Sequence, residues 1–208
     1  MDAFKGIAFL LKNPRLWPLA LVPGFIASLV YLALGWLGWH FYAADFEEWA
    51  KALALLAYLV IFPFAFYLLG SSFLGFVFDP LSREVEASLG EVPRCPLTTS
   101  QLVGDTCLRL LLNGLIGLLT IGLGVALGAV AGVLGAGLIG LLDYTSPAFL
   151  RRGLTLKEQA KLLLKKPDLP TVSFAAVAGF LSLVPFLGLF LAPAFIVGGV
   201  FLARRRLQ

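Results

Sequence analysis

Four long stretches of this chain contain no Asp, Glu, Lys or Arg, and they limit its fold more than any other feature. They cover residues 16–44, 52–78, 110–142 and 171–203 and are 29, 27, 33 and 33 residues long. A helix needs about 20 apolar residues to cross about 30 Å of hydrocarbon, so every stretch is long enough to enter a bilayer. Only 13% of all residues are charged, against about 25% in soluble domains. The chain is therefore predicted to be an all-α integral membrane protein, which excludes a soluble enzyme, a disordered chain and a disulfide-stapled secreted module.

The first two uncharged blocks are predicted to be transmembrane helices. Residues 16–44 and 52–78 each exceed one crossing, so each fits a tilted helix with interfacial ends. The short polar turn between them, at residues 45–51, is flanked by aromatic side chains. Trp36, Trp39, His40, Tyr42 and Trp49 form this group. Aromatic side chains gather at membrane–water interfaces, so we expect the turn at one bilayer surface.

The third and fourth blocks are each predicted to form a helical hairpin that enters the bilayer and turns back. A straight helix of 33 residues would be about 50 Å long, whereas two arms of about 16 residues would each be short for a full crossing. Glycines recur through the third block, and Gly124, Gly128 and Gly132 have the spacing of close helix packing. Pro185 breaks the fourth block, because proline removes a helical hydrogen bond. Residues 110–142 and 171–203 are therefore expected to be partly penetrating (re-entrant) hairpins.

The distribution of basic residues favours this topology. If both hairpins return to their side of entry, 15 of the 16 Lys and Arg residues lie on the side of the N-terminus, and only Lys51 lies opposite. Basic residues are enriched on the cytoplasmic side of membrane proteins. We therefore expect a single membrane domain over residues 1–208, with both termini in the cytoplasm.

The segments between the blocks are predicted to include short interfacial amphipathic helices. The first covers residues 1–13, a polar connector covers 79–109, and a basic amphipathic connector covers 143–170. In the last of these, Thr155 and Glu158 have the spacing of a capping box. Lys157, Lys161 and Lys165 follow on one helix face, while Leu156, Ala160 and Leu163 share another. Such a helix is expected to lie on an anionic leaflet.

The residues that usually perform catalysis or proton coupling are missing from the blocks. The blocks contain no Asp, Glu, Lys or Arg, and the one histidine of the chain, His40, lies near the aromatic group. Charged and titratable residues of these types inside the membrane are the usual sign of coupled pumps. The sequence shows no nucleophile–base pair and no metal-ligand spacing, and Cys95 and Cys107 do not form a CxxC motif. We expect no enzymatic activity, no catalytic residue, no cofactor or metal, and no nucleic-acid partner.

One short segment has the composition of an anion site. Asn13, Pro14, Arg15 and Leu16 lie where the first long helix begins. The first N–H groups of a helix have no intrahelical acceptor, and the guanidinium of Arg15 adds donors beside them. Sulfate needs only donors, whereas phosphate usually carries a proton and also needs an acceptor. The alternative is that Lys12 and Arg15 are positive-side anchors of the helix, with Trp17 in the interface.

Several motifs, in order along the chain, resemble the CysZ sulfate permeases, a family that also includes the etoposide-induced 2.4 proteins of eukaryotes. The motifs are residues 13–19 (NPRLWPL), 78–86 (FDPLSREVE), 142–144 (LDY) and 183–188 (LVPFLG). The resemblance implies two long membrane helices with two partly penetrating hairpins, a homo-oligomer, and sulfate uptake for cysteine synthesis. The family binds sulfate at a Gly-Leu-Arg-like turn at the start of the first long helix. Here that place reads Pro14-Arg15-Leu16, which keeps an arginine and replaces the glycine.

The sequence thus leads to two functional hypotheses of different classes. The first is a channel-like, uncoupled permease of the inner membrane for sulfate or a related oxyanion, with Asn13, Pro14, Arg15 and Leu16 as the binding residues. The alternative is a non-transporting protein that shapes the bilayer or scaffolds partners, because hairpins and basic amphipathic helices can act as wedges without a pore.

Overall fold

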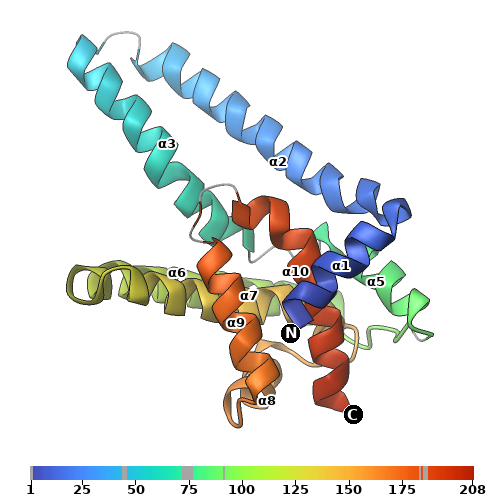
Figure 1. The fold of residues 1–208 in the computed structure, drawn as a ribbon. Coiled ribbons are helices and arrows are strands. Elements are labelled where there is room, and N and C mark those ends of the chain that lie inside the picture. The colour runs from blue at the N-terminus through green and yellow to red at the C-terminus, as the bar shows by residue number, and fades with distance from the viewer. Residues whose placement is uncertain (1, 44–45, 72–76, 91, 183, 185–186) are drawn as a thin grey trace.

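The computed structural model describes residues 2–43, 46–71, 77–90, 92–182, 184 and 187–208. Two long antiparallel helices, α2 (Trp17–Gly38) and α3 (Glu48–Ser71), form an arm that extends from the rest of the molecule (Figure 1). A π-helical turn over Trp39–Ala43 ends the first of them at the tip of the arm. Trp36 is 65% exposed and Trp49 is 66% exposed there. The two helices therefore hold the expected aromatic group at the far end of the arm.

The remaining helices gather at the base of the arm. They are α1 (Asp2–Lys12), α5 (Asp79–Ser88), α6 (Thr99–Leu127), α7 (Ala129–Leu150), α8 (Leu156–Leu164), α9 (Leu169–Ser182) and α10 (Leu187–Leu207). Aromatic side chains fill their core: the ring of Phe195 lies 5.1 Å from that of Tyr144 and 6.3 Å from that of Phe174, centroid to centroid. Every regular element in the described residues is helical. The expected all-α class is confirmed.

The helices α6 and α7 form the first hairpin, and they turn at Gly128. This glycine has φ +56°, a left-handed conformation that disfavours residues with a Cβ. Both helices extend beyond the uncharged residues 110–142, into the polar segments on either side. They are 29 and 22 residues long, longer than the arms of about 16 residues that the block alone would allow. Charged side chains at the ends of the hairpin are accommodated because the protein buries and pairs them.

Among the residues that the structure describes, three apolar helical segments are long enough to cross a membrane: Pro14–Phe41, Thr99–Gly124 and Ala129–Leu150. They differ in their surroundings, because 6% of the residues in the apolar window of the first and 67% of those in the window of the third are buried inside the protein. The α2 segment therefore presents its apolar surface to lipid or another chain, whereas α7 is a central core helix. The partial penetration of the two hairpins stays a prediction.

The second hairpin consists of α9 and α10. The first ends at Ser182 and the second begins at Leu187, which agrees with the expected break near Pro185, although Pro185 itself lies outside the described residues. The C-terminal helix packs against α1, so the two ends of the chain lie close together (Figure 1). Asp2 and Arg205 form an ion pair of 2.7 Å between them.

Close helix packing uses other glycines than the expected row. An added Cβ at Gly124 or Gly128 would meet nothing within 4 Å in the described chain, so these two do not form the predicted contact. One tight contact lies between α7 and α9: a Cβ on Gly179 would lie 2.3 Å from the carbonyl oxygen of Val133, and one on Gly137 would lie 2.6 Å from that of Ala175. Spacing alone marks where helices can approach, but the fold decides which faces meet.

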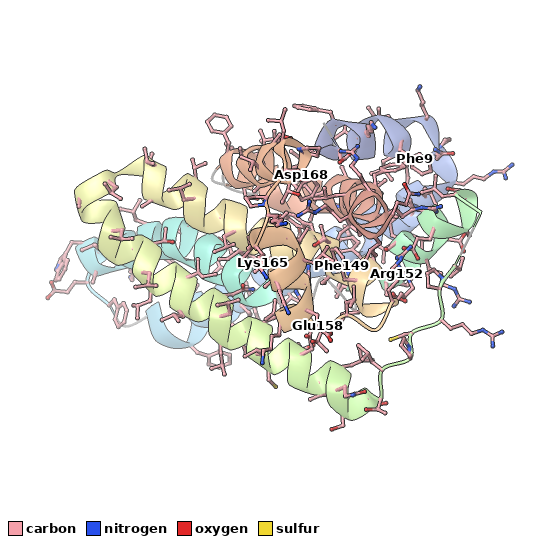
Figure 2. The ribbon with its side chains drawn as sticks, turned by 90° about the horizontal axis from the view of Figure 1, so that it is seen from below. Phe9, Phe149, Arg152, Glu158, Lys165 and Asp168 are labelled. Carbon is pink, nitrogen blue, oxygen red and sulfur yellow. The ribbon has the colours of Figure 1, made fainter. Side chains whose placement is uncertain are left out.

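The amphipathic helices differ in what covers their apolar faces. On α1, Phe4 is 52% and Leu11 is 65% exposed, which suits an interfacial helix. On α8, by contrast, Leu156 and Leu163 are buried in the protein core, while its two lysines, Lys157 and Lys161, and the C-cap residue Lys165 stay at the surface. Figure 2 shows Glu158 on this helix, Lys165 at its C-terminal end and Asp168 further along the chain. Only the lysine face of α8 is therefore free to meet an anionic leaflet.

Candidate functional site

The predicted anion segment forms a tight corner between α1 and α2. Pro14–Leu16 make one turn of 3₁₀ helix, in which the N–H of Leu16 donates to the carbonyl of Asn13 over 3.0 Å. The Asn13 side chain donates to the carbonyl of Phe9 at 2.8 Å, and the Trp17 indole donates to that of Leu10 at 3.0 Å. These bonds fix the end of α1 against the start of α2 and give the corner a defined shape.

Arg15 projects from this corner. Its side chain is exposed and has no hydrogen bond or ion pair in the described part of the chain. The backbone contributes fewer free donors than the sequence suggested, because the N–H groups of Leu16 and Trp17 already donate within the turn. Pro14 and Leu16 lie beside Arg15, and Asn13 is held by Phe9. The guanidinium is the principal free donor of the corner.

A buried polar cluster, here called the Arg109 cluster, joins α6, α7 and α8. Its centre is a guanidinium that is 2% exposed. The Arg109 Nε donates to Asp105 Oδ2 at 2.7 Å, Nη1 lies 3.4 Å from Asp143 Oδ1, and Nη2 donates to Gln159 Oε1 at 2.6 Å. Asn113 donates to the other oxygen of Asp143 at 2.7 Å. One arginine thus links three helices.

A second network, the Arg151 cluster, ties the end of α7 to α5. Arg151 Nη1 lies 2.5 Å from Asp79 Oδ1, and its Nε donates to Glu86 Oε2 at 3.0 Å. Its Nη2 also contacts the hydroxyl of Ser82. Arg152 donates to the remaining oxygen of Glu86, which is fully buried, at 2.5 Å. The buried carboxylate of Glu86 and the half-exposed carboxylate of Asp79 are thereby compensated by two arginines.

Sequence reasoning missed both clusters, because it treated residues outside the uncharged blocks as surface connectors. One signal was present: Asp105, Arg109 and Asn113 repeat at four-residue spacing, so they share one helix face. The partners of Arg109, Asn113 and Arg151 on α5, α7 and α8 lie on other helices and are more than 14 residues away along the chain. No local pattern in the sequence indicates these contacts.

The other candidate ligands are far apart. His40 stacks on Trp36 at the tip of the arm, with ring centroids 5.5 Å apart. Cys95 and Cys107 are both free and exposed. Among the described residues, no three metal-ligating side chains come together. The exposed Arg15 corner and the two buried arginine clusters are the chemically distinctive features of the described chain.

Comparison with known proteins agrees with this all-α membrane architecture. No curated protein matches the chain. The family model described as sulfate transporter CysZ/etoposide-induced protein 2.4 matches residues 2–193 of the 208. The match includes the Arg15 corner, both arginine clusters and the first hairpin. Because it covers most of the chain, this protein belongs to the sulfate transporter CysZ/etoposide-induced protein 2.4 family.

Proposed function

We propose that this protein lets sulfate, or a closely related oxyanion, pass down its gradient across the inner membrane. The observation that carries the proposal is the family match over residues 2–193, which makes this a sulfate-transporter-like membrane protein. The imported sulfate would feed cysteine synthesis. Both termini are assigned to the cytoplasm, in line with the ion pair that joins Asp2 to Arg205 and with the distribution of basic residues.

The proposed binding site is the corner formed by Asn13, Pro14, Arg15 and Leu16. Arg15 presents an exposed guanidinium without a competing carboxylate partner in the described chain. The bonds of Asn13 and Trp17 hold the corner rigid, which limits the entropy lost when an anion binds. The site provides donors and so suits the fully ionised sulfate better than a protonated phosphate.

The proposed flux is uncoupled from protons. A proton relay needs ionisable groups that can change charge during transport. The buried acids Asp105 and Asp143 contact Arg109, and the buried Glu86 contacts two arginines. Each of these acids is held by an arginine of the fold, so these groups suit a structural role better than a relay.

Oligomerisation is part of the proposal. On α2, Phe25 is 65% and Leu32 is 64% exposed; on α6, Leu111 is 72% and Leu118 is 69% exposed. In a membrane such surfaces face either lipid or another copy of the chain. A pathway between copies would allow the hairpins to border it with their uncharged blocks, residues 110–142 and 171–203.

The test is uptake of radiolabelled sulfate by purified protein in liposomes. We expect wild-type protein to transport and Arg15→Ala to reduce the initial rate at least about tenfold, since a hydrogen bond to a charged group contributes about 1.5–3 kcal/mol. Lys12→Ala is the matched control, because it removes an exposed positive charge three residues away. Equal losses in both variants would support the anchor interpretation instead, and unchanged flux in Arg15→Ala would refute the site.

A second candidate function rests on the exposed apolar face of α1. Phe4 and Leu11 on this helix, together with the lysine face of α8, would let the protein act as a membrane wedge or scaffold. Liposomes that take up no sulfate but become tubulated in the presence of the protein would favour this function. Sulfate uptake into vesicles of unchanged shape would favour transport.

A further inference from the structure

A cleft of about 600 Å³ lies among the connectors of the fold, and none of its described lining residues belongs to the Arg15 corner. It is bounded by the start of α5, the linker between α5 and α6, and the end of α7. Figure 2 shows this linker passing around the outside of the molecule. By the topology argued from the basic residues, these connectors face the cytoplasm.

Arginine side chains dominate the charge of the cleft. Among the described residues, Arg83, Arg94 and Arg151 line it together with a single acid, Asp79. Asp79 is already neutralised, because its Oδ1 lies 2.5 Å from Arg151 Nη1. Arg83 and Arg94 are exposed and form no ion pair within the described chain. Two guanidinium groups therefore remain free to bind an anion, and they come from different segments.

The remaining walls are apolar and the cleft is large. Val92, Leu102 and Leu150 lie among its lining residues. A volume of about 600 Å³ falls in the range of about 300–1,000 Å³ typical of sites for organic ligands. An inorganic tetrahedral anion would leave most of this space empty and would not use the apolar walls. The cleft is therefore suited to a ligand that has both an anionic group and an organic body.

We propose that this cleft binds an organic oxyanion, namely a phosphate or sulfate monoester, from the cytoplasmic side. Arg83 and Arg94 hold the oxyanion, since guanidinium groups match its geometry with paired charge-assisted hydrogen bonds. The organic part packs on the apolar walls. The ligand bridges α5, the linker and α7, next to the Arg151 cluster, so its binding stabilises the contact between these helices. This inference does not depend on sulfate transport.

Cys95 offers a direct reporter, because it lines the cleft, whereas the other cysteine of the chain, Cys107, does not. The full-length protein in phosphatidylcholine vesicles is alkylated with N-ethylmaleimide, and the two sites are followed by mass spectrometry. We expect adenosine 5′-monophosphate to slow the labelling of Cys95 in a saturable manner and to leave Cys107 unaffected. Inorganic phosphate and sulfate at the same concentration should not protect. Equal protection by the inorganic ions, or of both cysteines, would overturn the proposal.

The second arm separates a soluble ester from a lipid headgroup. Phosphatidic acid is also a phosphate monoester, so vesicles that contain it test the lipid source. Protection of Cys95 by either phosphatidic acid or adenosine 5′-monophosphate supports the proposed chemistry and identifies its source, and protection by neither refutes it.

The arginine assignment is tested with the double variant Arg83→Gln/Arg94→Gln. The concentration that gives half-maximal protection should rise at least about tenfold, because two charge-assisted contacts are lost. Lys157→Gln/Lys161→Gln makes the same charge change on the exposed face of α8 and should leave protection unchanged. Unaltered thermal unfolding without ligand shows that the double variant is folded. Protection that survives in it would refute the role of the two arginines.

Discussion

The Arg109 cluster allows the sharpest test of what holds this fold together. Replacing Arg109 with Met keeps the length and apolar contacts of the side chain but removes its charge. The side chains of Asp105 and Asp143 are 3% and 1% exposed and lose their shared cation. Removing one partner of a buried ion pair costs about 3–5 kcal/mol, because the remaining charge is left uncompensated. We expect Arg109→Met to lower the free energy of unfolding by that amount.

The geometry of the cluster explains why Arg109→Met should not lose less of the free energy of unfolding. Arg109 also donates to the backbone carbonyl of Leu142 at 3.0 Å and to Gln159 at 2.6 Å, so three helices lose a common contact. The guanidinium is 2% exposed, so bulk water does not contact it in the folded protein. Unfolding by SDS in mixed micelles, followed by circular dichroism, measures the change. Lys157→Met, which removes an exposed positive charge on α8, should stay within about 0.5 kcal/mol of wild type.

A compensating variant separates charge from packing. Adding Asp105→Asn and Asp143→Asn to Arg109→Met removes the two unpaired charges while keeping hydrogen-bonding groups at both positions. We expect this triple variant to regain a substantial part of the lost stability. If Arg109→Met alone unfolds within about 1 kcal/mol of wild type, the buried charges are not coupled as the distances imply, and the reasoning fails.

Two further predictions follow from the second hairpin. Burial alone would raise the pKa of the Asp168 carboxyl, but hydrogen bonds from Thr171 and the charge of Arg206 outweigh burial and lower that pKa. The contribution of Asp168 to stability is therefore present above about pH 4 and is lost as the pH falls through the lowered pKa. Asp168→Ala should cost about 1 kcal/mol of stability at neutral pH, because a helix cap is lost. Between pH 7 and pH 3, the unfolding temperature of this variant should decline less than that of wild type. Gly179→Val should prevent α7 and α9 from packing, because even its Cβ would lie 2.3 Å from the Val133 carbonyl oxygen, whereas Gly124→Val meets open space. Comparable amounts of monodisperse protein from both valine variants would contradict the second prediction.

The sequence by itself determined the class of this protein. Long uncharged blocks leave no alternative to helices in a bilayer, since every backbone polar group must be satisfied without water. Helix ends were also predictable where the signal is local. The capping box between Thr155 and Glu158 is present, with Thr155 N–H donating to Glu158 Oε2 at 2.8 Å, and the first hairpin turns at a glycine of the expected region.

Tertiary structure alone decided which polar side chains are buried and what they contact. Arg109 and Arg151 lie in segments that read as connectors, yet they are among the least exposed polar residues. Apart from Asp105, which lies one turn before Arg109 on α6, their charged and amide partners come from helices distant in sequence, so no periodicity encodes those contacts. The same holds for the glycines, where Gly179 packs and Gly124 does not. A hydrophobic pattern specifies which surfaces of the chain avoid water. Which charged side chains form pairs is determined by the packing of the helices, because it depends on distances between segments that are far apart in the sequence.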